Sequence, residues 1–240
     1  MENVSTTSLL NKLLGFSTPT VANIVATYPE NQHCLRLYDP WKGHWYTDQS
    51  VRCMFPEMGR RIGYAVTLTY SVPDPDHPEL PALSFVDLID ALDTAKKPII
   101  LACRQDYPQW VLDKAGLFGG HFTSLLKACG VVGVVTNGPS RDVDEMRPLD
   151  IQYIMSGVTV GHGEFVLRAV NTEVSVAGMD VTRGDIIHMD EHGAVRFPAS
   201  ALQDVCDHIK AFADEEERHV RALLAARTME DVRRIWGQQA

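Results

Sequence analysis

The chain has 240 residues, enough to bury a substantial core, and its 45% hydrophobic and 22% charged residues match ordinary globular usage. A formal net charge of -9 argues against nonspecific binding to nucleic acid, because affinity for phosphate backbones comes largely from lysine and arginine. The N-terminus lacks the features of a signal peptide, and no apolar run reaches the length of a membrane span. We therefore expect a cytoplasmic protein with no membrane contact, whose partner is a small molecule or a protein.

The N-terminal quarter predicts two helices and an irregular stretch. The segment MENVSTTSLLNKLLGF has the pattern of a first helix, and Thr18-Pro19-Thr20 resembles a capped entry to a second. Residues 31 to 61 contain several prolines and glycines, and we expect no regular element there. The aromatic residues of the 38 to 55 segment could bury at an interface between subunits.

From residue 63 on, predicted strands and helices alternate. Strands are expected over 63 to 71, 98 to 103 and 131 to 136, with helices near 83 to 95 and 120 to 129. Apolar strands separated by helices indicate a sheet covered on both faces. Further β-rich segments are expected near 151 to 156, 173 to 176 and 185 to 197, before a helical tail over 200 to 236. The pattern predicts an α/β protein, with one domain over residues 1 to 240 and its core at 60 to 200.

Two glycines, Gly119 and Gly120, stand directly before the helix expected near residue 120. Free backbone N–H groups and the helix dipole at such a position favour an anion. A phosphate or a carboxylate would fit there, and the alternative is a plain glycine turn. The chain has no GxGxxG or GxxxxGK(S/T) pattern, which disfavours a nucleotide site.

Arg141 and Asp142 follow the strand expected at 131 to 136, at an edge where open α/β sheets tend to hold ligands. Arg141 could fork onto a carboxylate, and Asp142 could hold a hard divalent cation. The alternative is an ordinary helix start, where the dipole favours aspartate anyway. A metal site at His188 or His192 is also conceivable, although the sequence around His192 fits a hairpin turn at least as well.

The segments GLFGGHFTSLLKACGVVGVVTNGPSRDVDEM and VTRGDIIHMDEHGAVRFP, in this order and spacing, resemble the family that joins 4-hydroxy-4-methyl-2-oxoglutarate aldolases with RraA-type regulators of ribonuclease E. The resemblance covers about residues 60 to 200. It implies a swivelling-type β/β/α domain, with a central sheet flanked by helices, a helical C-terminal tail, and assembly as a homotrimer or a hexamer with the site between subunits.

The resemblance also implies roles for individual residues. Backbone amides of a loop matching Gly119, Gly120, His121 and Phe122 would bind a 2-oxo acid, with Arg141 on its carboxylate. Asp142 would carry a divalent metal cation, Mg²⁺ or Mn²⁺, which acts as a Lewis acid toward the pyruvate enolate, as in a class II aldolase. No Schiff-base lysine is required.

One position departs from the family pattern. The family has an acidic residue twenty-one positions before the arginine, where this chain has Gly120. The resemblance implies that this carboxylate helps move a proton of the pyruvate methyl group, so its absence here leaves open whether the chain retains the acid-base step. His121 is adjacent and titrates near neutrality, which makes it a catalytic candidate beside Arg141 and Asp142. An aspartate placed at position 120 is expected to cost little at a helix start.

These observations predict a metal-dependent lyase that acts on a small 2-oxo acid. Its reaction would be retro-aldol cleavage of a 4-hydroxy-4-methyl-2-oxoglutarate-like substrate to pyruvate, or decarboxylation of an oxaloacetate-like compound. The alternative is a non-catalytic regulator of the RraA type that binds a ribonuclease or another protein.

Overall fold

The computed structural model describes residues 5 to 237, which divide into two compact units. One unit combines the chain up to Gly43 with the chain from Ala201 on, and the other spans His44–Ser200. Among the described residues, no helix has both the length and the apolar character needed to cross a membrane. A single domain over the whole chain stays a prediction.

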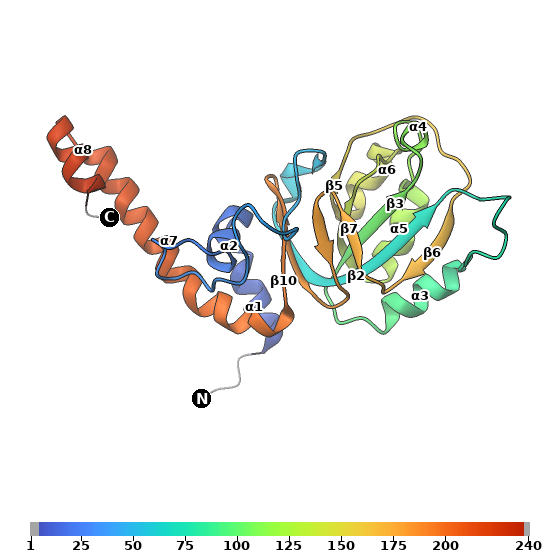
Figure 1. The fold of residues 1–240 in the computed structure, drawn as a ribbon, viewed down its shortest axis with the longest axis horizontal. Coiled ribbons are helices and arrows are strands. Elements are labelled where there is room, and N and C mark those ends of the chain that lie inside the picture. The colour runs from blue at the N-terminus through green and yellow to red at the C-terminus, as the bar shows by residue number, and fades with distance from the viewer. Residues whose placement is uncertain (1–4, 238–240) are drawn as a thin grey trace. The chain divides into compact units, whose positions relative to one another are not determined.

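An eight-stranded sheet is the centre of the 44 to 200 unit (Figure 1). Its strands lie in the order β1-β5-β4-β3-β2-β9-β10, and β6 pairs with β2 outside this path. The pairs β2-β3, β3-β4 and β4-β5 are parallel, whereas β1, β6, β9 and β10 pair antiparallel with their neighbours. The strands are β1 (Arg52–Cys53), β2 (Arg61–Ser71), β3 (Ile99–Asp106), β4 (Val131–Thr136), β5 (Gln152–Met155), β6 (Val166–Val170), β9 (Ile186–Asp190) and β10 (Gly193–Phe197).

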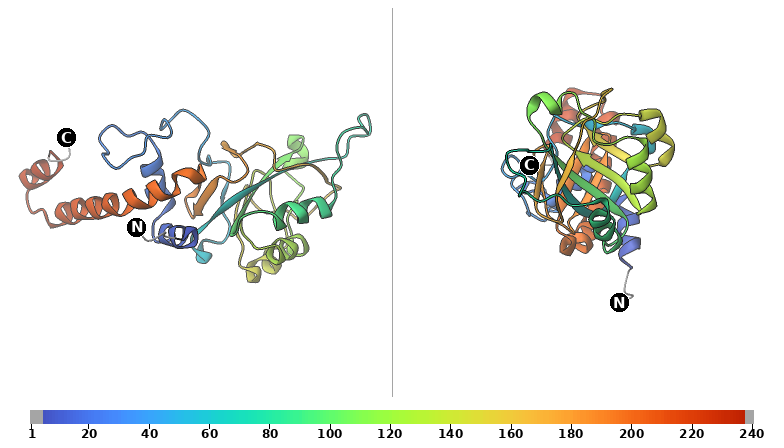
Figure 2. Two further views of the ribbon diagram at one scale, coloured as in Figure 1. Left: turned by 90° about the horizontal axis from the view of Figure 1, so that it is seen from below. Right: turned by 90° about the vertical axis from the view of Figure 1, so that its right-hand side faces the viewer.

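The two faces of the sheet are covered differently. Side chains of β3 alternate, so that Ile99 and Leu101 belong to one core cluster and Ile100 to the other. Helices cover the first face, where Leu126 of α5 joins the cluster, and a separate hairpin covers the second, where Val176 contributes. Figure 2 shows α5 and α6 side by side. The elements concerned are α3 (Phe85–Asp93), α4 (Gln109–Leu112), α5 (Gly120–Ala128), α6 (Val143–Met146), β7 (Val174–Val176) and β8 (Met179–Val181).

The predicted β/β/α class, with a central sheet, flanking helices and a helical tail, is confirmed by this arrangement. Strand β6 and the second strand of the β7-β8 hairpin were not predicted, because both are short and only partly apolar. The irregular stretch at residues 31 to 61 contains only the two-residue strand β1 and the short 3-10 helix η1 (Pro56–Met58). Of the aromatic residues in the 38 to 55 segment, Trp45 is 2% exposed and Trp41 is 89% exposed, so burial of this segment at a subunit interface stays a prediction.

The other unit is helical, and side chains cap the N-termini of α1, α2 and α8 but not that of α7. It contains α1 (Thr6–Leu13), α2 (Thr18–Val25), α7 (Leu202–Ala225) and α8 (Met229–Trp236). Ser17 caps α2 one residue before the predicted Thr18 entry, and Thr228 forms a capping box with Asp231 in α8. Val205 and Ile209 of α7 are buried, and α7 packs against α1 and α2.

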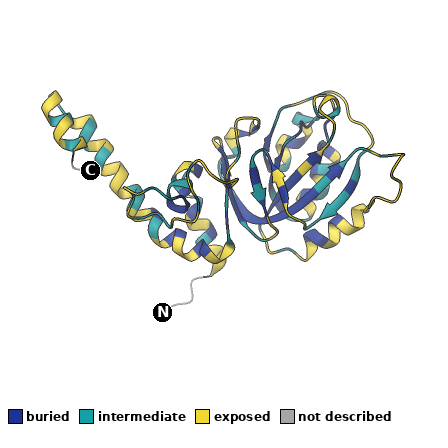
Figure 3. Cartoon of the chain, viewed as in Figure 1, coloured by how far each residue is buried: buried dark blue, intermediate teal, exposed yellow. Residues whose placement is uncertain are grey.

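The apolar stripe of the tail is not covered along its whole length. Val220 is 46% exposed and Leu224 is 82% exposed, although both lie at the same helical spacing as Val205 and Ile209. Figure 3 shows how exposure increases along α7 and into α8. Helical periodicity therefore predicted the helix correctly but did not predict where its burial ends.

Candidate functional site

The loop before α5 and the loop after β4 lie side by side. Phe118 pairs with Ser140 in an isolated parallel bridge, and the Arg141 backbone N–H donates to the Phe118 carbonyl at 2.9 Å. Asn137 continues the pairing of β4 with β3, because its side chain accepts from the Gln105 N–H at 2.7 Å and donates to the Gln105 carbonyl at 3.0 Å. These contacts hold the glycine turn, formed by Gly119 and Gly120, next to the Arg-Asp turn, formed by Arg141 and Asp142.

Asp142 occupies the N-cap position of α6, yet its side chain makes no capping hydrogen bond to that helix. Its backbone is left-handed, with φ 56° and ψ 42°, a conformation that costs a non-glycine residue about 1 kcal/mol. The carboxylate turns toward α5, where Oδ2 accepts from the Gly120 N–H at 3.4 Å. Asp142 therefore does not behave as a simple helix-start aspartate of α6.

Arg141 binds the Asp142 carboxylate through its Nε group and leaves its two terminal Nη groups without a bond to a described residue. Its Nε lies 3.0 Å from Oδ1 and 3.1 Å from Oδ2 of Asp142. The two side chains are 33% and 28% exposed. Within residues 5 to 237 the terminal Nη groups of Arg141 have no hydrogen-bond partner, so they can donate hydrogen bonds to the carboxylate of a ligand.

Two carboxylates fill the space beside the two glycines. A Cβ at Gly119 would lie 2.5 Å from Asp142 Oδ2, and one at Gly120 would lie 2.7 Å from the Cβ of Glu145 and closer still to its carboxylate. Neither glycine has a positive φ, so packing and not backbone conformation requires glycine at both positions. Glu145 was missed in the sequence. The available signal was its position three residues after Asp142, which places both residues on one turn.

His121 and Phe122 lie in the first turn of α5, with their side chains in different surroundings. The Phe122 ring stacks on Phe118 with centroids 5.1 Å apart and meets Phe85 edge-on at 5.5 Å, so only its backbone can face a ligand. The His121 side chain is exposed, and the structure records no hydrogen bond from it to another described residue. The structure thus gathers Gly119, Gly120, Arg141 and Asp142, and does not bring the His121 ring into contact with them.

The groups buried beneath α5 are unsuited to acid-base work. Thr123 Oγ1 and Tyr153 Oη lie 2.9 Å apart and anchor the helix to β5. Burial raises the pKa of the Tyr153 hydroxyl and that of the Cys103 thiol well above neutrality, so both stay protonated. The exposed carboxylates of α6 are therefore the acid-base candidates nearest to the glycine turn.

Two places could hold a metal. Within residues 5 to 237, the one group of three ligand side chains whose atoms lie within 4.8 Å of one another is Asp190, Glu191 and His192. However, Asp190 is buried, and its Oδ1 accepts from the His192 N–H at 2.9 Å and lies 3.1 Å from His192 Nδ1. These contacts favour the hairpin-turn interpretation, and His188 is buried in β9 outside this group.

The pair formed by Asp142 and Glu145 suits a different kind of site. Magnesium usually keeps several waters and binds through one or two carboxylates, so it needs no closed group of protein ligands. Both carboxylates lie against the glycine turn, and Glu145 is exposed. The donor chemistry therefore fits a hard divalent cation held partly by water.

A hollow of about 520 Å³ opens near the same edge of the sheet. Asn137, Pro139, Ser156 and Gly157 are among its lining residues, whereas Arg141 and Asp142 are not. Arg141 and Asp142, whose side chains are part-exposed, are therefore not part of this hollow.

The chain thus combines a β/β/α fold with a helix start that faces an Arg-Asp turn. The family model described as RraA-like, Aldolase/RraA, matches residues 36 to 196, and the chain belongs to this family. The match confirms the resemblance seen in the sequence and extends it toward the N-terminus.

Relatives and solved structures are distant. Protein DlpA of Legionella pneumophila subsp. pneumophila is 29% identical over 119 residues, which cover 49% of this chain and 19% of that protein. A Halalkalibacterium halodurans protein named "Putative 4-hydroxy-4-methyl-2-oxoglutarate aldolase" is 24% identical over 106 residues, 44% of this chain and 50% of that protein. The chain thus spans no more than half of these two relatives. Streptomyces coelicolor RraAS2, described as a member of the RNase ES inhibitor RraA protein family, superposes with a TM-score of 0.63 at 20% identity, covering 92% of this chain and 98% of that one.

Proposed function

We propose that this chain is a divalent-metal-dependent lyase that cleaves a small 2-oxo acid to give pyruvate. The observation that carries the proposal is the Asp142 carboxylate, which leaves its own helix and lies with Arg141 against the glycine turn of α5. Retro-aldol cleavage of a 4-hydroxy-4-methyl-2-oxoglutarate-like substrate is the leading reaction. Decarboxylation of an oxaloacetate-like compound requires the same groups.

Substrate binding is assigned to Arg141 and the first turn of α5. The unpaired Nη groups of Arg141 can make a planar, two-pronged contact with the carboxylate of the 2-oxo acid. The first N–H groups of a helix have no acceptor within the helix, so those of His121 and Phe122 face outward to an anion. Both contributions favour a negatively charged ligand.

Asp142 is the residue that would hold Mg²⁺ or Mn²⁺, and Glu145 would reach the cation only through water, which leaves its carboxylate available as a base. Such a cation, when bound, supplies Lewis-acid stabilisation of negative charge on the substrate oxygens. The Arg141 Nε keeps the Asp142 carboxylate oriented, and each carboxylate oxygen has two lone pairs, so hydrogen bonding leaves acceptor capacity for a metal.

We also assign the proton transfer to Glu145. In the sequence, His121 was the candidate for this role. Its carboxylate lies beside Gly120, the position where the resemblance implies an acidic residue. An exposed carboxylate there can take or return a proton of the pyruvate methyl group through water. His121 would then have no direct part in the chemistry.

Pyruvate release tests the proposal. Purified protein is incubated with 4-hydroxy-4-methyl-2-oxoglutarate or with oxaloacetate, in added Mg²⁺ or Mn²⁺ and in excess chelator. We expect pyruvate formation that requires the cation and saturates with substrate. Release at the spontaneous rate for both substrates, with either metal, would rule out the lyase.

The second candidate is a regulator that binds a protein, and uncovered apolar side chains of the tail favour it. Leu224, Met229 and Trp236 are each more than 60% exposed. A pull-down with a ribonuclease E-type enzyme, using Leu224→Ser as the control, tests this function. We also infer assembly as a homotrimer or a hexamer, which light scattering at micromolar concentration would contradict by showing a monomer.

A further inference from the structure

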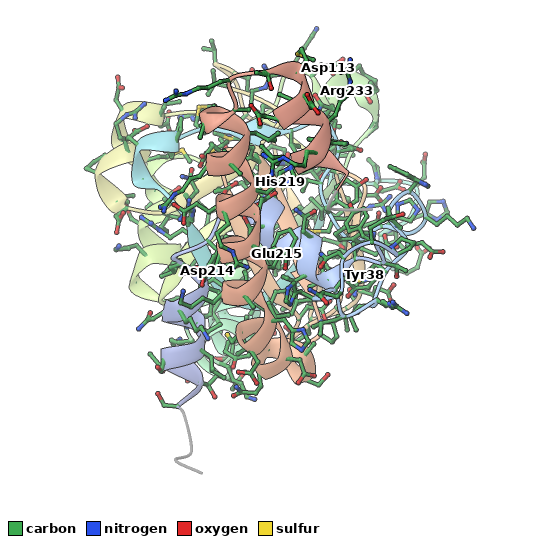
Figure 4. All side chains as sticks on the ribbon, turned by 90° about the vertical axis from the view of Figure 1, so that its left-hand side faces the viewer. Tyr38, Asp113, Asp214, Glu215, His219 and Arg233 are labelled. Atoms are coloured by element: carbon green, nitrogen blue, oxygen red, sulfur yellow. The ribbon has the colours of Figure 1, made fainter. Side chains whose placement is uncertain are left out.

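Helices α7 and α8 enclose a groove of about 640 Å³ that lies outside the residues matched by the family model. Small side chains, among them Ala222 and Ala225, line part of it, and Arg218, His219 and Arg227 bring polar groups to it. Figure 4 shows His219 on α7 and Arg233 on α8. The volume lies within the range of small-molecule sites, about 300 to 1,000 Å³.

The acidic residues of this groove already have partners. Glu215 lies 3.0 Å from His33 Nε2, and the hydrogen bond from His33 is the main cause that lowers the pKa of Glu215. Asp231 caps α8 through Thr228 and lies 3.3 Å from an Arg234 nitrogen. Neither carboxylate forms an ion pair with the side chain of Arg218 or Arg227 among the described residues, although the Arg227 backbone N–H donates to Asp231 at 3.3 Å.

The charges of Arg218 and Arg227, the other two arginines of the groove, are not neutralised by a paired carboxylate of a described residue. Neither Arg218 nor Arg227 forms a side-chain ion pair with another residue in the part of the chain that the structure describes. Arg218 acts on Glu215 only as a weak, through-space contribution to its lowered pKa. Two guanidinium groups thus present unpaired donors to one groove, and guanidinium forks match phosphate and carboxylate oxygens.

His219 supplies an independent observation. Its Nε2 is buried without a hydrogen-bond partner among the described residues, while its ring packs edge-on against Trp236 at 5.5 Å. A buried ring nitrogen without a hydrogen-bond partner is unfavourable unless a ligand or a water supplies that partner. In the tautomer that carries hydrogen on Nε2, this nitrogen can donate to an oxyanion. His219 therefore lines the same groove as the two unpaired arginines and has a ring nitrogen that no described residue satisfies.

We propose that the groove between α7 and α8 binds a small dianion, carrying either a phosphoryl group or two carboxylates. Arg218 and Arg227 neutralise the two charges, and His219 hydrogen-bonds one oxygen inside the groove. A partner helix could lie over the alanines, but only its acidic side chains could satisfy the buried imidazole. A compact dianion fits these donors more directly.

Calorimetric titration of the full-length protein with inorganic phosphate and with succinate tests the proposal. We expect saturable binding of at least one probe, weakened about tenfold in Arg227→Gln, since a charged hydrogen bond is worth about 1.5 to 3 kcal/mol. Arg233→Gln removes a neighbouring charge of α8 that does not line the groove, and binding should stay within about twofold of the wild type. Which probe binds identifies phosphoryl or carboxylate chemistry.

Three outcomes would overturn the proposal. One is no saturable binding of either probe. Another is equal weakening in Arg227→Gln and Arg233→Gln, which would indicate a general charge effect. The third is loss of binding in Arg141→Lys and not in Arg227→Gln, which would place the anion at the candidate lyase site. Circular dichroism of each variant verifies that α7 and α8 remain folded.

Discussion

The side chain of Glu145 lies in the space that a side chain at Gly120 would occupy. The two residues are 25 positions apart in sequence and belong to α6 and α5. A Cβ at position 120 would lie 2.7 Å from that of Glu145, so an aspartate there requires α6 to shift and is not the inexpensive change that the sequence suggested. Only one of the two positions can hold a carboxylate without rearrangement.

Exchanging the two positions tests this relationship. Glu145→Ala should slow exchange of the pyruvate methyl protons by about 10²-fold or more, because acid-base help of this kind is removed. Gly120→Asp alone should lower the melting temperature, and Gly120→Asp combined with Glu145→Ala should recover stability and part of the exchange. Deuterium loss from labelled pyruvate, followed by NMR with Mg²⁺, measures the rates. Wild-type exchange in Glu145→Ala would remove Glu145 from the mechanism.

Gly119→Ala should displace the Asp142 carboxylate, because the added Cβ would lie 2.5 Å from its Oδ2. We expect weaker Mn²⁺ binding, measured by electron paramagnetic resonance, with only a small change in stability, because the backbone at Gly119 is extended. The matched control is Gly163→Ala, since a Cβ at Gly163 meets nothing within 4 Å. Equal Mn²⁺ affinity in both variants would contradict the assignment of Asp142.

Asp142→Asn should abolish the dependence of turnover on Mg²⁺ and lower pyruvate formation by at least about 10²-fold, since the amide loses the charge that holds a hard cation. The fold should persist, because no capping hydrogen bond of α6 depends on this side chain. Asp144→Asn, at an exposed position on the same helix, is the control and should retain activity. Turnover that still rises with Mg²⁺ in Asp142→Asn would show that the cation is anchored elsewhere.

Arg141→Lys should raise the KM for the 2-oxo acid about tenfold although the charge is kept, because an ammonium group cannot make a planar fork. Arg104→Lys is the control, since Arg104 pairs with Asp106 on the surface of β3, 2.9 Å away. Steady-state kinetics and competition by oxalate report the change. The same KM in both variants would exclude two-pronged recognition by Arg141.

Much of the fold could be predicted because local patterns determine it. The run VVGVVT between a helix end and a Gly-Pro turn predicts β4 with its observed bounds, since buried parallel strands are short, apolar and β-branched. The first strand of the β7-β8 hairpin was predicted, and its second strand follows a turn at Ala177-Gly178, where both residues have a positive φ. That this hairpin covers one face of the sheet depends on distant contacts, so no local pattern predicted it.

The sequence predicted only part of the site, again because some of its residues are brought together by contacts between distant parts of the chain. Arg141 and Asp142 could be identified because they follow a strand end, a local relationship. Glu145 reaches the site through packing against a glycine of another helix, which spacing along one chain does not reveal. His121 stands beside the glycines in sequence, but adjacent residues on a helix point in different directions.

Phe122 has its ring in the aromatic core and its backbone N–H in the first turn of α5. The ring contacts Phe118, Phe85 and Tyr70, so the core holds in place the amides to which we assign anion binding. Little conformational entropy remains to be lost when a ligand binds to such a turn. Ligand affinity at this turn thus depends partly on a side chain that the ligand does not touch, and a change in the core can weaken binding while every contacting group remains.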